Sequence, residues 1–478
     1  MMLVTTVGLA GCAVGPDYQA QVVRPVALAQ GSDSALFSSS EVQRDWWRQF
    51  QDPQLDKMVD IALERNHDIR IVQARLLEAR AVVDQKKLDE LPTVTAEASY
   101  SRSLSQANPG PVGSRNLAES YRTSMDASWE IDLFGRLRRI AEASAARSEA
   151  VEADLAQARI VVVAEVARNY FEMRGAEQRL TVAQANLKNQ EEALRVVEVM
   201  WASGRGSADD LSRARAEVAS TRATIPPLET DHRRAFDRLA VLTGSRPDEM
   251  PELTRKESLP PLAARFPIGK LSELLGRRPD VVSAERELAA STADIGAITA
   301  ELYPRIDLGG FLGFVAVRGV DLGSSPSQGF GVAPVISWPA FHLATVKARQ
   351  REVRAREKGA RARYEQTVLR AIEETDVALT TYEQTQKRVR DLAAAAVESE
   401  RAAELARARY RAGNALYLVQ LDAERNLLNI QDALSEAEMA SYVSMVALYK
   451  ALGGGWVAPE YIGTSSAVKG VNASNSNG

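Results

Sequence analysis

The chain has 478 residues, of which 45% are hydrophobic and 26% charged, and a formal net charge of −4 at pH 7. Nucleic-acid binding needs a concentrated basic surface, whereas the arginines here are mixed with glutamate and aspartate along the sequence, so a nucleic-acid partner is not expected. No run of about 18 apolar residues occurs beyond the start of the chain, so no transmembrane helix is expected either.

A short apolar segment precedes Cys12, the single cysteine, so no disulfide can form within the chain. Leu9-Ala10-Gly11-Cys12 resembles a bacterial lipoprotein processing site, which implies a signal segment over 1–11, cleavage before Cys12 and lipid attachment to it. No Lys or Arg precedes the cysteine, which departs from the usual basic start of a signal peptide. The alternative is a chance buried cysteine. In the lipoprotein pattern that this site resembles, Ala13 rather than Asp after the cysteine implies delivery to the outer membrane.

After an N-terminal leader over 12–45, a first structural repeat is expected over 46–250. The pattern is helical from Trp46, with a helix start at Asp52-Pro53 and a run that continues to Glu90. Two segments then alternate with period two and predict strands at about 93–105 and 118–133. A very long helix follows from Gly135 to about Ser203. It is followed by a turn at about 203–208 and a return helix to about Leu242, which Pro226-Pro227 must interrupt.

The second repeat, expected over 251–454, has the same order of elements. A helix is predicted from Pro279 to Glu301, and strands at about 305–317 and 328–338. A second very long helix runs from about Ala340 to Arg411, a turn lies at about 411–415, and a return helix ends at Leu452. The Gly/Ser/Asn-rich tail over 455–478 is expected to be flexible.

Landmarks of the two repeats are separated by one offset, 209 residues. The pairs are Trp129 with Trp338, Gly204 with Gly413, Ala214 with Ala423, and Gly244 with Gly453. A period of this length does not fit a solenoid and indicates a duplicated, domain-sized unit of helix, two strands, long helix, turn and return helix.

The alternating segments predict strands with one apolar and one polar face, which suits a sheet between lipid and water as well as an ordinary soluble sheet. Four strands cannot enclose a lumen, and a sheet in lipid cannot leave edges unpaired. If the strands lie in a membrane, several chains must share one barrel, and three chains would supply twelve strands. The helices would then form a hollow cylinder.

Several stretches resemble the TolC-like outer-membrane factors, in particular the lipoprotein branch that contains OprM and NodT. The resemblance runs from Cys12 to about Trp456, and Phe341-His342-Leu343-Ala344 departs from it because the family commonly has glycines there. The matching stretches are Cys12-Ala13-Val14-Gly15-Pro16-Asp17-Tyr18, Trp129-Glu130-Ile131-Asp132-Leu133-Phe134-Gly135-Arg136, Leu274-Leu275-Gly276-Arg277-Arg278-Pro279-Asp280 with Ala284-Glu285 and Ala293-Asp294-Ile295-Gly296, and Leu302-Tyr303-Pro304-Arg305-Ile306.

This resemblance implies a mainly α-helical fold with a membrane β-barrel part, in which a homotrimer forms a twelve-stranded barrel and a helical tunnel in the periplasm. It implies an exit duct of a tripartite efflux system in the outer membrane of a Gram-negative bacterium. The expected partners are a periplasmic adaptor, an inner-membrane pump of the RND type and outer-membrane lipid. No cofactor is expected apart from the covalent lipid on Cys12.

The resemblance also implies a periplasmic gate at the two hairpin turns, around Gly204, Ser207 and Gly413. The expected gate residues are Asp209, Asp210, Tyr410, Leu418 and Asp422. Leu418 and Asp422 are four residues apart, so they share a helix face and would form an apolar and an acidic ring under threefold symmetry.

The closing ion pairs must be specific to this chain, because some family members have a gate arginine where this chain has Ala415. Arg205, Arg409 and Arg411 are candidates for these ion pairs. Two plainer interpretations compete with the gate: Asp210 could simply solvate a helix start, and Tyr410 could be an ordinary packing residue.

No catalytic constellation is present in the sequence, so an enzyme is not expected. His67, His232 and His342 lack close metal-ligand company and are expected at ordinary structural positions. The alternative function is a lipid-anchored periplasmic coiled-coil adaptor, which would lack the alternating strands.

Overall fold

The computed structural model describes residues 13–20, 36–38, 40, 42–106, 115–251, 253–254, 265–269 and 274–456. Cys12, the signal segment and the tail from residue 457 onward lie outside the described residues. The chain divides into two compact units. The first comprises Met1–Gln21, Arg75–Glu152 and Ser283–Glu365, and the second comprises Val22–Ala74, Ala153–Val282 and Gln366–Gly478.

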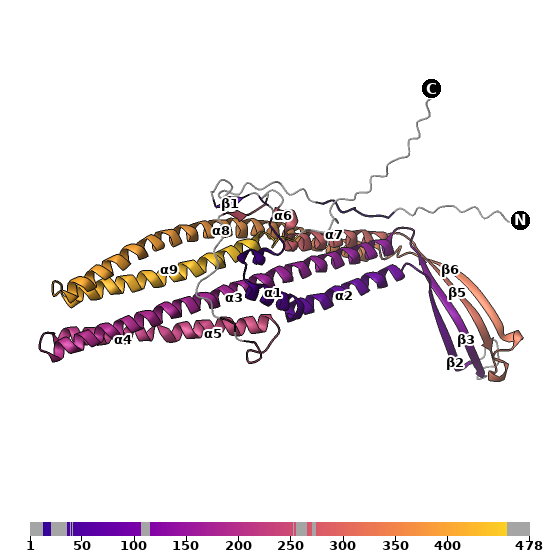
Figure 1. Ribbon diagram of the computed structural model, residues 1–478. Coiled ribbons are helices and arrows are strands. Elements are labelled where there is room, and N and C mark those ends of the chain that lie inside the picture. The colour runs from indigo at the N-terminus through magenta and orange to yellow at the C-terminus, as the bar shows by residue number, and fades with distance from the viewer. Residues whose placement is uncertain are drawn as a thin grey trace, which may run out of the picture. The chain divides into compact units, whose positions relative to one another are not determined.

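Helices dominate the described chain (Figure 1). They are α1 (Pro53–Arg65), α2 (His67–Leu88), α3 (Arg136–Ala202), α4 (Ala208–Ala223), α5 (Ile225–Leu242), α6 (Leu274–Arg277), α7 (Pro279–Ala300), α8 (Leu343–Arg411) and α9 (Tyr417–Ala451). Helices α3 and α8 have 67 and 69 residues. They are rich in Ala, Arg and Glu, contain no proline and have only Gly175 and Gly359 as weak positions, so helix propensity is high throughout.

The first unit contains a four-stranded antiparallel sheet in the order β2-β3-β5-β6 (Figure 1). Its strands are β2 (Thr93–Gln106), β3 (Arg115–Ile131), β5 (Arg305–Ala316) and β6 (Gln328–Ser337). They correspond to the strands expected from the sequence, except that β3 begins three residues earlier. Within the described chain, β2 and β6 are the outer strands of this sheet, and each is paired on one side.

The strand register confirms the duplication. Thr93 faces Ser128 in the hairpin β2–β3, and Arg305 faces Ser337 in the hairpin β5–β6. The second strands of the two hairpins keep the offset of the sequence landmarks, whereas the first strands are offset by three residues more. The difference arises because the paired residues Thr93 and Ser128 are 35 residues apart in the sequence, whereas Arg305 and Ser337 are 32 apart.

The two hairpins are also fastened to their preceding helices by the same hydrogen bond. Trp129 Nε1 donates to the backbone oxygen of Glu90, and Trp338 Nε1 donates to that of Leu302, both at 3.0 Å. The two tryptophan donors are separated by the same offset as the second strands, and the two backbone acceptors by the same offset as the first strands. The tryptophans that mark the repeat therefore hold the chain in place just before each first strand.

The helix expected from Pro53 to Glu90 is interrupted, so that prediction was wrong. Asn66 separates α1 from α2. Its Oδ1 accepts from the backbone N–H groups of Asp68 and Ile69 at 2.9 and 3.2 Å, which starts a new helix. Its Nδ2 donates to the backbone oxygen of Leu242 at 2.9 Å.

The return helix of the first repeat is divided as expected, with α4 ending at Ala223 and Pro226 in the first turn of α5. Proline has no backbone N–H to donate, so it is accommodated where a helix begins.

The second unit has an aromatic core. Trp46, in a short 3-10 helix (Trp46–Phe50), stacks on Tyr449 at 4.5 Å between ring centroids, and Phe50 contacts Phe171 at 4.8 Å. A short parallel pair, β1 (Phe37–Ser38) with β4 (Phe266–Pro267), brings Phe266 within 4.4 Å of Tyr449. This pair was not predicted.

Candidate functional site

The two turns that join the long helices to their return helices lie in the second unit (Figure 1). Each has a glycine in the left-handed conformation, Gly204 at φ 75° and Gly413 at φ 72°. The residues that follow bond back to the preceding helix, Arg205 N–H to Met200 O and Asn414 N–H to Arg409 O, both at 2.9 Å. Glycine adopts this conformation without strain, so the sequence ends both helices abruptly.

The return helices start differently in the two hairpins. Ser207 caps α4, because its Oγ accepts from the backbone N–H groups of Asp209 and Asp210 at 3.1 and 3.2 Å. Helix α9 has Leu416 at the equivalent position and no side-chain cap. Asp209 binds Arg213 one turn along its own helix at 2.8 Å. The exposed carboxylate of Asp209 is thus paired within the first hairpin.

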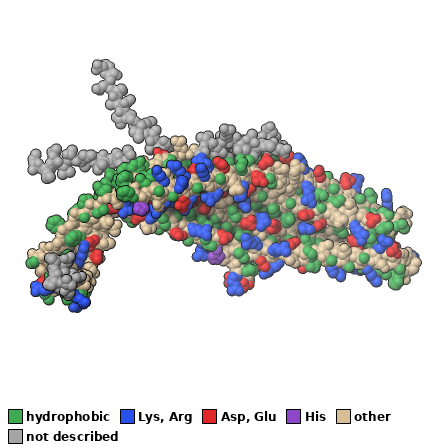
Figure 2. All heavy atoms as spheres, turned by 180° about the vertical axis from the view of Figure 1, so that it is seen from behind, with side chains coloured by type: hydrophobic (Ala, Val, Ile, Leu, Met, Phe, Trp, Pro, Cys, Tyr) green, Lys and Arg blue, Asp and Glu red, His purple; other side chains and the backbone are tan. Residues whose placement is uncertain are grey.

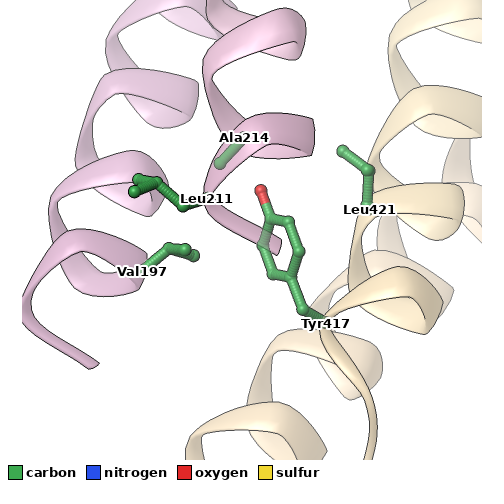
Figure 3. Close-up of a cluster of buried hydrophobic side chains, with 5 residues drawn as sticks. All are labelled: Val197, Leu211, Ala214, Tyr417 and Leu421. Carbon is green, nitrogen blue, oxygen red and sulfur yellow. The ribbon is translucent and has the colours of Figure 1, made fainter. Parts of the chain in front are cut away.

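A buried tyrosine joins the two helical hairpins, α3–α4 and α8–α9. Tyr417, at the start of α9, lies among Val197, Leu211 and Ala214 of the first hairpin and Leu421 of its own helix. Figure 3 shows its ring directed away from α9, with the hydroxyl toward Ala214. The residue is only 2% exposed. Among the described residues its hydroxyl has no hydrogen-bond partner.

Tyr410 lies at the margin of this cluster. Its ring centroid is 5.6 Å from that of Tyr417, and its hydroxyl donates to Met200 Sδ at 3.2 Å. Burial, followed by the carboxylate of Asp210, raises the pKa of the Tyr410 hydroxyl. Burial, with the charge of Glu424 as the next cause, raises the pKa of Tyr417 to about 12. Both phenols therefore stay neutral at physiological pH.

Polar contacts also link the hairpins farther from the turns. Arg425 on α9 donates to the buried carboxylate of Glu217 on α4, with Nε at 2.6 Å. Glu424, also buried, accepts from Gln190 on α3 at 3.2 Å and from Arg407 on α8 at 3.0 Å. A charge on one hairpin thus meets its partner on the other, which fixes the register of the four helices in this region.

The structure brings some of the expected gate residues together. Asp210 is half-buried beside Tyr410 and Tyr417, and Leu418 and Asp422 are both exposed on α9. The pKa of Arg213 is raised by its hydrogen bond to Asp209 and then by the nearby charges of Asp210 and Asp422. Asp210 and Asp422 therefore both lie near enough to Arg213 to interact with its charge.

The arginines considered as gate partners have a different status. Within the described ranges, no salt bridge involves Arg205, Arg409 or Arg411. Ala415 is half-buried in the second turn. Near the turns, the hairpins of the described chain meet through the aromatic and apolar cluster around Tyr417, and their ion pair Arg425–Glu217 lies farther along the helices.

Sequence reasoning missed Tyr417, Glu217, Glu424 and Arg425. The helical pattern places Tyr417 at a helix start but does not indicate that its ring crosses to the other hairpin. A signal was available for Arg425, which follows the expected gate residue Asp422 by three residues and so lies on a neighbouring part of the helix surface.

A second candidate functional surface is one face of the sheet in the first unit. Side chains that share this face are connected by the register, since Tyr100 faces Tyr121 and Met125 faces Leu312. Its exposed apolar members are Val94, Tyr100, Leu104, Leu117, Met125, Leu312, Phe330, Val332 and Ile336. The other face carries Arg122, Ser124 and Asp126, which hydrogen-bond to one another.

The apolar surface extends to the place where the sheet joins the helices of this unit, where Figure 2 shows hydrophobic side chains gathered. Trp338 and Phe341, which follow β6, are 53% and 99% exposed. A soluble sheet would not leave so many large apolar groups in water.

The residues after Cys12 are held against the first unit. Val14 N–H donates to Phe134 O at 3.1 Å, and Asp17 accepts from Arg139 at 2.5 Å. Tyr18 donates to Glu285 at 2.8 Å. Gly15, at φ 100°, lies so close to Gly296 that a Cβ would come within 2.5 Å of the Gly296 Cα. The position of Ala13 is thereby fixed next to Gly135, where β3 gives way to α3.

His232 Nε2 lies 3.2 Å from Glu177 Oε1, and His67 and His342 are exposed. The described residues contain no group of His, Cys, Asp and Glu suited to hold a metal ion. No helix among them is long and apolar enough to cross a membrane.

Comparison with known proteins agrees with this geometry. The family described as "Outer membrane efflux protein" matches twice, over residues 58–245 and 271–454, once for each repeat. The chain is 30% identical to the outer membrane protein OprJ of Pseudomonas aeruginosa, over 95% of both chains. It is 32% identical to the antibiotic efflux pump outer membrane protein ArpC of Pseudomonas putida, again over 95% of both.

Solved structures give the same result. A structure of the outer-membrane channel OprN has a TM-score of 0.89 and 43% identity, covering 93% of this chain and 100% of that one. The open state of the Neisseria gonorrhoeae MtrE channel has a TM-score of 0.82 and 31% identity, covering 93% and 98%. The chain belongs to the outer membrane efflux protein family. It has the barrel-plus-helical-tunnel fold of these channels and serves as an outer-membrane efflux channel.

Proposed function

We propose that three copies of this chain form one passive, non-catalytic exit duct, with a shared twelve-stranded barrel and a tunnel made of the helical hairpins. The observation that carries the proposal is the four-stranded sheet with an exposed apolar face and two outer strands. In lipid, each unpaired backbone group on an edge strand costs several kcal/mol, so an isolated sheet of this kind is unstable there. Pairing β6 of one copy with β2 of the next removes every edge.

Attachment of lipid to Cys12 is part of the same proposal. Ala13, the next residue, is held beside Gly135 at the start of α3. The residue that follows Cys12 therefore lies near the end of β3, which supports lipid attachment close to the sheet.

The duct is proposed to work with a periplasmic adaptor and an inner-membrane pump of the RND type. Relatives are named for different cargoes: ArpC for antibiotics, the Escherichia coli protein CusC for cations and the Pseudomonas aeruginosa protein OpmQ for pyoverdine. Because relatives with such different cargoes are similar to this chain, we infer that the duct carries a small molecule and that the pump selects it.

The hairpin turns are proposed as the gate. Under threefold symmetry, the exposed Leu418 and Asp422 would form rings around the axis, with Asp209, Asp210 and Tyr410 behind them. The arginines without a salt bridge in one described chain, Arg205, Arg409 and Arg411, would be available to carboxylates of a neighbouring copy. Carboxylates crowded on an axis repel one another, so a closed gate requires such counter-charges.

The oligomer is tested by native mass spectrometry of the full chain in detergent, where a trimer is expected. A folded, stable monomer would contradict the proposal.

The gate is tested by single-channel recording in planar bilayers. The double variant Asp210→Ala/Asp422→Ala is expected to raise conductance. Asp391→Ala, which removes an exposed acid from α8 away from the turns, is the matched control and should leave conductance unchanged. Unaltered conductance and ion selectivity in the double variant would remove both aspartates from the gate.

A further inference from the structure

Phe341 has a ring that the rest of the described chain leaves 99% exposed. It lies in the short connection between β6 and α8, three residues after Trp338. Full exposure of a phenylalanine is costly, because about 25 cal/mol is lost for each Å² of apolar surface that stays in water. We therefore expect another surface to cover this ring in the assembled protein.

The first repeat shows what an aromatic residue in this connection does. Phe134 lies between β3 and α3 and stacks on Tyr303, with ring centroids 4.6 Å apart and planes inclined by 17°. Tyr303 comes two residues before β5, at the beginning of the second repeat's hairpin. The end of the first repeat's hairpin is thus packed against the beginning of the second repeat's hairpin.

The two connections are similar but not identical. Phe134 follows Trp129 by five residues, whereas Phe341 follows Trp338 by three. Each connection nevertheless contributes one phenylalanine ring between its strand and its long helix. In the first repeat that ring has an internal partner, and in the second repeat it has none within the described chain.

The strand boundaries identify the missing partner. Tyr303 lies two residues before the first residue of β5, and Leu91 lies two residues before the first residue of β2. Leu91 is 56% exposed. The two outer strands thus offer Phe341 and Leu91 close to the positions at which Phe134 and Tyr303 meet in the internal contact.

We propose that Phe341 of each copy packs against Leu91 of the next copy around the barrel. This inference rests on the proposed trimer and specifies its junction. The pairing of β3 with β5 also transfers: Ser128 faces Gly309, so Ser337 faces Glu97 of the next copy. Each shared barrel would then contain three internal Phe134–Tyr303 contacts and three Phe341–Leu91 contacts between copies.

Cross-linking in detergent tests the contact directly. In the double variant Leu91→Cys/Phe341→Cys, mild oxidation should produce covalent dimers and trimers on a denaturing gel. The parent chain and both single variants should give no such ladder. Leu104→Cys/Phe341→Cys is the geometric control, because Leu104 lies eleven residues along β2 from Thr93 and should not reach Phe341.

The outcomes separate the two levels of the proposal. A native trimer without a covalent ladder, or with an equal ladder in the Leu104 control, would overturn the Phe341–Leu91 contact, leave the trimer intact and place the ring in lipid instead. A folded monomer would overturn the proposed function itself.

A second measurement covers the case in which the cysteine variants do not assemble. Phe341→Ser should lower the temperature at which the trimer dissociates in detergent. Val320→Ser, which alters a residue that is 89% exposed between β5 and β6, should leave it unchanged. Equal dissociation temperatures for Phe341→Ser and the parent would also overturn the contact.

Discussion

Tyr417→Phe should strengthen the contact between the two hairpins. The variant keeps the ring among Val197, Leu211 and Ala214 and removes only the hydroxyl. That hydroxyl is buried and has no hydrogen-bond partner within the described residues. When the hairpins pack together, the native hydroxyl leaves water for an apolar environment. Removing it therefore removes this desolvation penalty and leaves only a very small cavity.

The magnitude follows from the cost of an unsatisfied buried polar group, about 1–3 kcal/mol. Opening of the hairpins would return the hydroxyl to water, so the closed arrangement should gain about 1–2 kcal/mol in the phenylalanine variant, a factor of about 5–30 in the population of the open form. A cavity-forming change, Tyr417→Ala, should act in the opposite direction and destabilise the contact by about 3 kcal/mol or more.

Hydrogen exchange measured on the intact protein in detergent is a suitable assay. Backbone amides flanking the turns, around residues 194–214 and 410–424, should exchange about 5–30 times more slowly in Tyr417→Phe if opening limits their exchange. Tyr410→Phe is the control, because its hydroxyl has a partner in Met200 Sδ and its loss should not slow exchange. Faster or unaltered exchange in Tyr417→Phe would refute the reasoning and would mean that the hydroxyl finds a partner in the assembled protein.

The same residue gives a pH dependence. Burial and the charge of Glu424 raise the pKa of Tyr417 from 10.0 to about 12, which means that the packed form favours the neutral phenol. Its contribution to hairpin stability is fully present below pH 10 and is lost as the pH rises toward 12, because the exposed phenol deprotonates first. Tyr417→Phe should show a smaller loss of amide protection over this interval, and identical profiles for the two proteins would contradict the assignment.

Three further variants test contacts described above. Glu217→Gln removes the negative partner of Arg425; since the arginine is half-exposed, a loss of about 1 kcal/mol is expected in thermal unfolding, and a loss that does not diminish in high salt would contradict an ionic origin. Ser207→Ala removes the cap of α4 and should cost about 1 kcal/mol of local stability, seen as faster exchange of the Asp209 and Asp210 amides. Gly15→Ala would place a Cβ against Gly296 and should make residues 13–18 accessible to limited proteolysis. Gly359→Ala is the control, because the space around Gly359 is open and cleavage should not change. Equal cleavage of the two variants would show that the Gly15–Gly296 contact does not hold the segment in place.

Much of this architecture was predictable from local sequence. The alternating segments predicted the four strands to within three residues, and Gly204 and Gly413 marked both hairpin turns because a left-handed residue ends a helix wherever it occurs. These features depend on a few neighbouring residues, so one sequence is enough to find them.

Features that depend on distant residues were not predictable in the same way. The break at Asn66 contains neither proline nor glycine, and its stability draws on the distant Leu242. The pair β1–β4 has two residues in each strand and no detectable period. Tyr417 gave no local indication that it joins the two hairpins, since burial of its ring requires Leu211 and Ala214 of the other hairpin.

The junction at which Asn66 meets the Leu242 carbonyl has a counterpart in the second repeat, where Arg278 Nη1 donates to the Ala451 carbonyl at 3.2 Å. These positions correspond by the same two offsets that relate the strands, yet one side chain is a neutral amide and the other a cation that also binds Asp280 and Glu374. After duplication, each half was thus free to change its donor as long as the carbonyl stayed occupied. A chain assembled from two copies of the first repeat would keep the hydrogen bond to the carbonyl but would lose the ion pairs of Arg278 with Asp280 and Glu374. The two repeats therefore have the same geometry at this junction but different chemistry, and one cannot replace the other.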